Sequence, residues 1–194
     1  VKWRLRHSRA TVGPRSNWRP DDAKKPGTFA NTVLMARRLS ERGVRFVQTL
    51  HGDMQPWDSH SNIKEEHRKC ANQCDSGLAA LIIDLKQRGL LDETLILCTG
   101  EFGRTPGINA SLGRDHFASA WSCSLSGMGV RGGVVHGATD KEGHTVVDGE
   151  ASAADLFATI LQAVGIDPAH EYMVGSRPTP LADFGAKPIR SVLA

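Results

Sequence analysis

The chain has 194 residues, 40% of them hydrophobic and 23% charged, which is typical of a globular protein with a packed core. No apolar run approaches the ~18 residues that a membrane-spanning helix needs, so we expect no membrane span. The formal charge of +3 is uneven, because residues 1–27 carry eight Lys or Arg against two Asp and the rest of the chain is slightly acidic.

We interpret residues 1–27 as a disordered basic arm or linker, because prolines interrupt them and their apolar residues show no period. A basic arm can bind nucleic acid. No aromatic or motif pattern of a nucleic-acid-binding protein accompanies it, so nucleic acid is not an expected partner. No apolar segment of a secretion signal follows the basic residues, which leaves the localisation of the chain unknown.

The first half of the chain predicts two helices and two strands. Thr28 can cap a helix over residues 29–42, and alternating apolar residues at 44–50 predict a strand. Apolar residues at three-and-four spacing predict a long helix over 62–88, and the apolar run 94–99 predicts a second strand. This β-α-β order favours parallel strands joined by a right-handed crossover.

The second half of the chain predicts short strands and one more helix. Residues 121–125 and 134–136 predict strands, and residues 140–143 predict a hairpin-like turn. Ser152, with Asp155 three residues later, forms a capping-box pattern that opens a helix. The tail after this helix is rich in Pro and Gly, so we expect it to run over the surface.

The four cysteines form no Cys-x-x-Cys pair, so zinc-ribbon and thioredoxin-like sites are not expected. Free cysteine packs as a small hydrophobic residue. We therefore expect buried thiols at all four positions: Cys70, Cys74, Cys98 and Cys123.

Three polar clusters follow apolar runs or loops, at residues 57–60, 100–106 and 113–116. Ligands of α/β sheets gather at the carboxyl ends of the strands. In an extended loop, residues two apart point to the same side, so Asp58 and His60 can face one ion. Our hypothesis is that the three clusters converge on one metal site.

The candidate metal ligands combine carboxylates and imidazoles, which favours Zn²⁺ or Mn²⁺ and leaves Ca²⁺ or Mg²⁺ open. They are Asp58, His60, Glu101, Asp115 and His116. The two adjacent ones, Asp115 and His116, either both bind or one orients the other through a hydrogen bond.

Two guanidinium groups beside this set suit a phosphate or sulfate group, and a nearby amide can donate to the same anion. They belong to Arg104 and Arg114, with the amide of Asn109, although surface ion pairs and a loop turn explain them equally well. His51 has two possible roles: it is a metal ligand or base, or it is a solvated loop side chain. No nucleophile elbow is recognisable, so no catalytic nucleophile is identified.

Seven motifs, long and in order, resemble the DUF1501 family of the alkaline phosphatase–sulfatase superfamily, from about residue 28 to the end. They are residues 36–48 (ARRLSERGVRFVQ), 57–62 (WDSHSN), 84–94 (DLKQRGLLDET), 100–106 (GEFGRTP) with Asn109, 113–116 (GRDH), 137–140 (GATD) and 155–160 (DLFATI).

The resemblance implies a three-layer α/β/α sandwich with divalent metals at the strand ends. It places Asp58, His60 and His116, with Asp115 as a further candidate, at a first metal and Glu101 at a second. The Asp-His pair usual at that strand end reads Glu101-Phe102 here, which removes one imidazole ligand.

The family's N-terminal half carries the first strand, a metal-binding Asp and the nucleophile region, and residues 1–27 do not resemble it. We therefore expect residues 28–194 to be the C-terminal part of an alkaline-phosphatase-like domain, an incomplete copy without the N-terminal strands.

The resemblance implies a metal-dependent hydrolase of small-molecule phosphate or sulfate esters, weak or inactive as this chain alone. A non-catalytic remnant that binds metal or a partner is the alternative. An open apolar sheet edge would allow a homodimer. The family suggests export to the bacterial periplasm.

Overall fold

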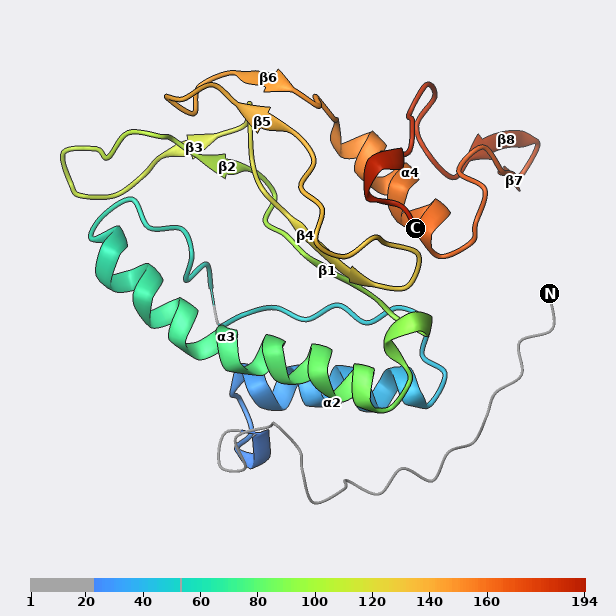
Figure 1. Ribbon diagram of the computed structural model, residues 1–194, viewed down its shortest axis with the longest axis horizontal. Helices are drawn as coiled ribbons and strands as arrows, with labels where there is room; N and C mark the ends of the chain where they lie inside the picture. The colour runs from blue at the N-terminus through green and yellow to red at the C-terminus, as the bar shows by residue number, and fades with distance from the viewer. Residues whose placement is uncertain (1–22, 53) are drawn as a thin grey trace. The chain divides into compact units, whose positions relative to one another are not determined.

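The computed structural model describes residues 23–52 and 54–194. The arm predicted at residues 1–27 therefore lies mostly outside the described residues. These form two compact units, the first made of residues up to Leu90 with Asn109–Gly113 and the second of Leu91–Ile108 with Arg114–Ala194. Within them the chain forms three α-helices and four two-stranded antiparallel sheets (Figure 1).

Helix α2 (Phe29–Glu41) begins at the predicted cap, where the Asn31 N–H donates to Thr28 Oγ1 over 3.2 Å. Helix α3 (Ile63–Gln87) packs against α2 in the first unit (Figure 1). A Cβ added at Gly77 of α3 would lie 3.3 Å from Ala30 Cα, so this glycine lets the two helices approach closely. Both helix predictions are confirmed.

An ion-pair network lies buried between the two helices. Arg37 is 3% exposed, and its Nε lies 3.0 Å from Asp84 Oδ2 without hydrogen-bond alignment. Arg88 Nε donates to the other carboxylate oxygen of Asp84 over 3.0 Å. Glu41 pairs with both Arg37 and Arg88. Burial lowers the pKa of Arg37, and Glu41 opposes that shift. The carboxylates of Glu41 and Asp84 therefore compensate the positive charge of the buried Arg37 guanidinium.

The segment 44–50 is not a strand, so that prediction is wrong. The segment pairs with no strand of the described chain. Phe46 and Leu50 are 83% and 74% exposed, so its apolar side chains are not packed into a sheet face. The predicted parallel β-α-β unit is consequently not formed among the described residues.

In the second unit the 3₁₀ turn η1 (Leu91–Glu93) leads into strand β1 (Leu95–Cys98), which confirms the strand predicted at 94–99. Its partner is β4 (Ser124–Gly127), antiparallel, with Leu95 opposite Gly127. The strand predicted at 121–125 is therefore displaced toward the C-terminus. A Cβ at Gly127, whose φ is +95°, would lie 2.1 Å from Thr94 O. Only glycine fits that position.

Short hairpins make up most of the second unit. Strand β2 (Gly103–Arg104) pairs with β3 (His116–Phe117), at positions where the sequence predicted no strand. Strands β5 (Ala138–Thr139) and β6 (Val146–Asp148) flank the predicted turn, which confirms it.

The turn between β5 and β6 is closed by Asp140, whose carboxylate accepts the backbone N–H groups of His144 and Thr145. These bonds lower the pKa of Asp140. Residues 134–136 form no strand, so that prediction is wrong: Val135 is 91% exposed and offers no buried face.

Helix α4 (Ala153–Ala163) has the predicted capping box, in which the Asp155 N–H donates to Ser152 Oγ and the Ser152 N–H donates to Asp155. The tail, predicted only as a surface segment, folds a hairpin from β7 (Glu171–Val174) and β8 (Arg177–Pro180). The 3₁₀ turn η2 (Arg190–Val192) follows near the C-terminus.

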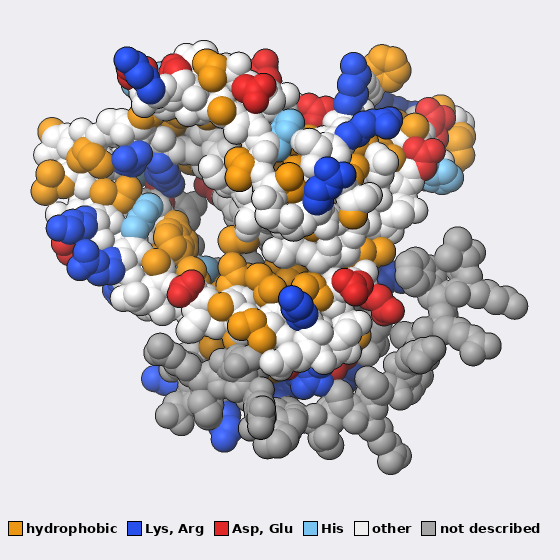
Figure 2. Space-filling view, viewed as in Figure 1, with side chains coloured by type: hydrophobic (Ala, Val, Ile, Leu, Met, Phe, Trp, Pro, Cys, Tyr) orange, Lys and Arg blue, Asp and Glu red, His pale blue; other side chains and the backbone are white. Residues whose placement is uncertain are grey.

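The described fold is thus a mixed α/β arrangement with small antiparallel sheets. Cys70 is buried as predicted, but Cys98 and Cys123 are exposed. Burial was the wrong prediction for these two: Cys98 ends β1, whose two-stranded sheet leaves its faces uncovered, and Cys123 lies in the loop just before β4. Hydrophobic side chains lie open to solvent at several places on the surface (Figure 2). Phe157 and Met173 are among the large hydrophobic residues that are exposed. None of the described helices has the length and hydropathy to cross a membrane.

Candidate metal centre

Asp58 and His60 form a pair in the loop that precedes α3. Asp58 Oδ1 lies 3.1 Å from His60 Nε2, and the two side chains are 25% and 47% exposed. A tight turn sets their spacing, since the Asp58 N–H donates to Gln55 O over 2.9 Å and the Ser59 N–H donates to Trp57 O. Ser59 between them points inward and is 7% exposed. The predicted same-side placement of Asp58 and His60 is confirmed.

The backbone of His60 is fixed by the segment Asn109–Gly113, which belongs to the same unit. Asn109 Nδ2 donates to His60 O over 3.1 Å, and Asn109 Oδ1 accepts the N–H groups of Ser111 and Gly113. A Cβ at Gly113 would lie 1.9 Å from the His60 carbonyl carbon, so only glycine fits there. The Asn109 amide therefore organises backbone, and its predicted contact with an anion stays a prediction.

In the second unit, the β2–β3 hairpin carries the other predicted residues. Arg104 lies opposite His116 in the ladder, and the His116 ring lies 4.2 Å from the Phe102 ring, centroid to centroid. The Arg104 guanidinium lies 5.6 Å from the centre of the same ring. The hairpin thus groups one guanidinium and one imidazole around Phe102.

Thr105 ties the hairpin to the segment that precedes His116. The Thr105 N–H donates to Asp115 O, and the Asp115 N–H donates to Thr105 Oγ1. Arg114 Nη1 donates to Thr105 O over 3.1 Å. Glu101 is exposed on the loop after β1. The ligand roles of Glu101 and Asp115 and the anion-binding roles of Arg104 and Arg114 stay predictions.

A ring cluster beside Asp58 was not predicted. Trp57 Nε1 donates to His51 Nδ1 over 2.8 Å, and His67 Nε2 lies 3.1 Å from Trp57 O. Burial lowers the pKa of His51. The only available signal was the position of Trp57 next to Asp58, because the role of His67 depends on packing of the loop against α3.

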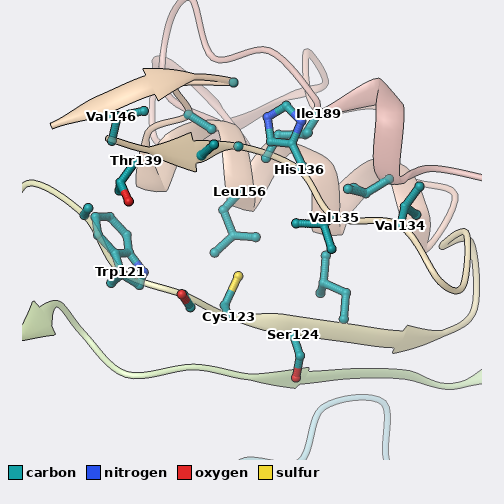
Figure 3. Close-up of a pocket in the computed structure, with 18 of the residues that line it drawn as sticks. Trp121, Cys123, Ser124, Val134, Val135, His136, Thr139, Val146, Leu156 and Ile189 are labelled. Carbon is teal, nitrogen blue, oxygen red and sulfur yellow. The ribbon is translucent and has the colours of Figure 1, made fainter. Parts of the chain in front are cut away.

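The second unit also contains a cavity of about 680 Å³ that no sequence motif indicates. Trp121, Leu156 and Cys123 face one another across it, and His136 lies at its edge (Figure 3). Ser191 Oγ lies 2.8 Å from His136 Nδ1. Apolar and polar groups line the cavity in similar measure, and none of the predicted site residues lines it.

Comparison with known proteins gives one match. No curated protein and no solved structure matches the chain. The family described as "Protein of unknown function (DUF1501)" matches residues 8–193. The match begins before the motifs that carry the resemblance, so it extends the family's coverage of this chain from about residue 28 to residue 8. Because the match spans nearly the whole chain, the protein belongs to the DUF1501 family.

Proposed function

We propose that the protein is a metal-dependent hydrolase of phosphate or sulfate esters, related to the alkaline phosphatase–sulfatase superfamily. In this proposal Asp58 and His60 of the first unit hold one divalent ion, and His116 is the further ligand that the sequence predicts. The observation that carries it is the Asp58–His60 pair, preorganised in a turn of the first unit. The three-layer α/β/α sandwich is the fold that this relationship implies.

Chain connectivity supports the inclusion of His116. Gly113 packs directly on the His60 backbone, and His116 follows it by three residues. Three extended residues span at most ~10 Å, so His116 is tethered within a short reach of His60. The close contact of Gly113 with the His60 backbone can therefore bring His116, distant in sequence, to the same ion.

The donor set fits a transition metal. One carboxylate oxygen and two imidazole nitrogens suit Zn²⁺ or Mn²⁺ better than Ca²⁺ or Mg²⁺. Three protein ligands leave a position for water or an ester oxygen, and a bound ion would supply Lewis-acid polarisation there. Glu101 and Asp115 are the proposed additional oxygen donors.

The guanidinium groups of Arg104 and Arg114 are the proposed anion contacts, with Asn109 as a further donor. A guanidinium presents two parallel N–H groups to a phosphate or sulfate, which gives both affinity and orientation. Arg114 is already oriented by its bond to Thr105 O. No residue of the chain is assigned as the nucleophile.

A second candidate is a non-catalytic protein that binds metal or a partner, and a homodimer is one form of it. The exposed apolar side chains favour it, because Phe46, Val135 and Phe157 are 83%, 91% and 62% exposed. Exposed apolar surface of this kind commonly marks an interaction site. This candidate predicts ion or partner binding without ester turnover.

Calorimetric titration of the chain with Zn²⁺ and Mn²⁺ tests the metal site. We expect saturable binding that is lost in His60→Ala and kept in His170→Ala, which removes an exposed imidazole outside the proposed site. Turnover of aryl phosphates and sulfates, sensitive to a chelator, then separates the two candidates. Binding without turnover supports the second candidate, and equal binding by both variants contradicts the site.

A further inference from the structure

A turn carries the first proposed ligand, and three contacts fasten this turn to its surroundings in the first unit. The turn is residues 55–58, closed by the bond from the Asp58 N–H to Gln55 O. Cys70 Sγ donates to Pro56 O over 3.3 Å, and His67 Nε2 lies 3.1 Å from Trp57 O. His67 and Cys70 are three apart on α3 and therefore lie on one helix face.

The third contact runs through the Trp57 ring. Its indole N–H donates to His51 Nδ1 over 2.8 Å. The Trp57 ring packs between two imidazoles, with centroid distances of 5.6 Å to His51 and 5.2 Å to His67. The His51 ring in turn meets Phe29 of α2 edge-on at 5.0 Å. Trp57 is thus linked to both helices of the first unit.

The chemistry of these bonds fixes the tautomers of both histidines. An indole N–H only donates, so His51 Nδ1 is unprotonated and a neutral ring carries its proton on Nε2. A carbonyl only accepts, so His67 donates from Nε2. The partial burial of His51 lowers its pKa, which favours the neutral imidazole that this bond requires. The cluster is therefore a defined hydrogen-bonded arrangement and not a loose group of rings.

We propose that Trp57 is a positioning residue for the loop that carries Asp58 and His60. His51 and His67 hold Trp57, and Trp57 keeps these two side chains oriented toward one ion. Asp58 follows Trp57 directly, and the Trp57 carbonyl accepts both the Ser59 N–H and the His67 Nε2–H. Rotation of Trp57 therefore moves both ligand-bearing residues. The proposal rests on the proposed metal site, and one of its tests does not.

Two variants remove the indole bond. Trp57→Phe keeps an aromatic ring but loses the N–H, and His51→Ala loses the acceptor. Loss of a contact that orients a metal ligand typically lowers ion affinity about 10–100-fold. We expect Zn²⁺ or Mn²⁺ affinity to fall about tenfold in both variants, while the unfolding midpoint changes little.

Two matched controls isolate the bond. His51→Asn loses the ring as His51→Ala does, but its Oδ1 offers an acceptor near the position of Nδ1, so it restores affinity. Trp121→Phe makes the same substitution at a tryptophan outside the cluster and leaves affinity unchanged. If the Trp57–His51 bond only stabilised the fold, the variants would instead lower the unfolding midpoint and the ion affinity together, and His51→Asn would not restore affinity.

Amide hydrogen exchange tests the positioning without any ion. We expect the Asp58 N–H to exchange at least about tenfold faster in Trp57→Phe and His51→Ala, with the buried C-terminal half of α3 unchanged. Unchanged exchange and affinity in both variants would overturn the proposal and leave the metal site standing. If the wild-type chain binds no ion, the proposed function fails, and the exchange of Asp58 alone decides whether Trp57 positions the turn.

Discussion

The two units differ in what they bury. The first buries aliphatic side chains and an ion-pair network between two helices, with Leu85 1% and Val33 2% exposed. The second has small buried apolar residues, such as Ala158 and Ala163, and its largest fully buried side chain is Thr159. Apolar area removed from water stabilises the first unit more, while local hydrogen bonds matter more in the second. The first unit should therefore be the last to open.

Removal of the buried Asp84 carboxylate is the strongest test of this difference between the two units. Asp84→Ala leaves the Arg37 guanidinium, 3% exposed, without its closest interhelical carboxylate. Breaking a buried pair in this way costs about 3–5 kcal/mol. We expect a loss of that size in the free energy of unfolding measured with urea. Arg38→Ala, on the exposed face of α2, should change it by no more than about 0.5 kcal/mol. Equal effects of the two substitutions would contradict a structural role for the network.

In the second unit, Thr159→Val tests the role of a single buried hydroxyl. Thr159 is fully buried, and its Oγ1 donates to Asp155 O over 2.6 Å and accepts the Ile189 N–H over 2.8 Å. Valine keeps the shape but leaves the Ile189 N–H without its acceptor, which costs about 1–3 kcal/mol. Hydrogen exchange of Ile189, measured beside the unfolding free energy, should accelerate. A neutral substitution would show that packing and not hydrogen bonding holds this part of the unit.

Loss of the cap on α4 is a smaller test in the same unit. Ser152→Ala removes the acceptor of the Asp155 N–H and one donor to its carboxylate. Removal of an N-cap hydroxyl costs about 1 kcal/mol. The same substitution at Thr28 removes the cap of α2 in the first unit, so the pair compares one local interaction in both units. If Thr28→Ala destabilises the chain and Ser152→Ala does not, packing and not the N-cap stabilises α4.

Local sequence signals predicted the helices but not the sheets. The caps Thr28 and Ser152 and the three-and-four apolar spacing of α3 act within one segment, so the pattern alone reveals them. The partner of β1 is β4, and that pairing depends on contacts between segments far apart in the chain. The segment 44–50 shows the same limit, because alternation indicates a strand but does not supply the neighbour it needs.

The candidate site divides in the same way. Asp58 and His60 were predictable, because their spacing of two residues in a loop is local. His67 was not, since it becomes relevant only where α3 packs against the turn that holds Trp57. The buried Arg37 was also hidden, because a helix pattern shows apolar faces and not a charge compensated by Asp84 on a neighbouring helix.

The pH dependence of stability gives the smallest expected effect and again singles out the first unit. Burial lowers the pKa of His51 in the folded chain, while the unfolded chain binds that proton near pH ~6.5. The unfolded state therefore holds more protons as the pH falls through this value, so the contribution of His51 is present above it and lost below. Urea unfolding of the wild-type chain between about pH 5 and 8 should show a steeper acid loss than His51→Asn. His144→Asn in the second unit is the control for a general histidine effect, and an equal reduction of the slope by both variants would remove His51 from this account.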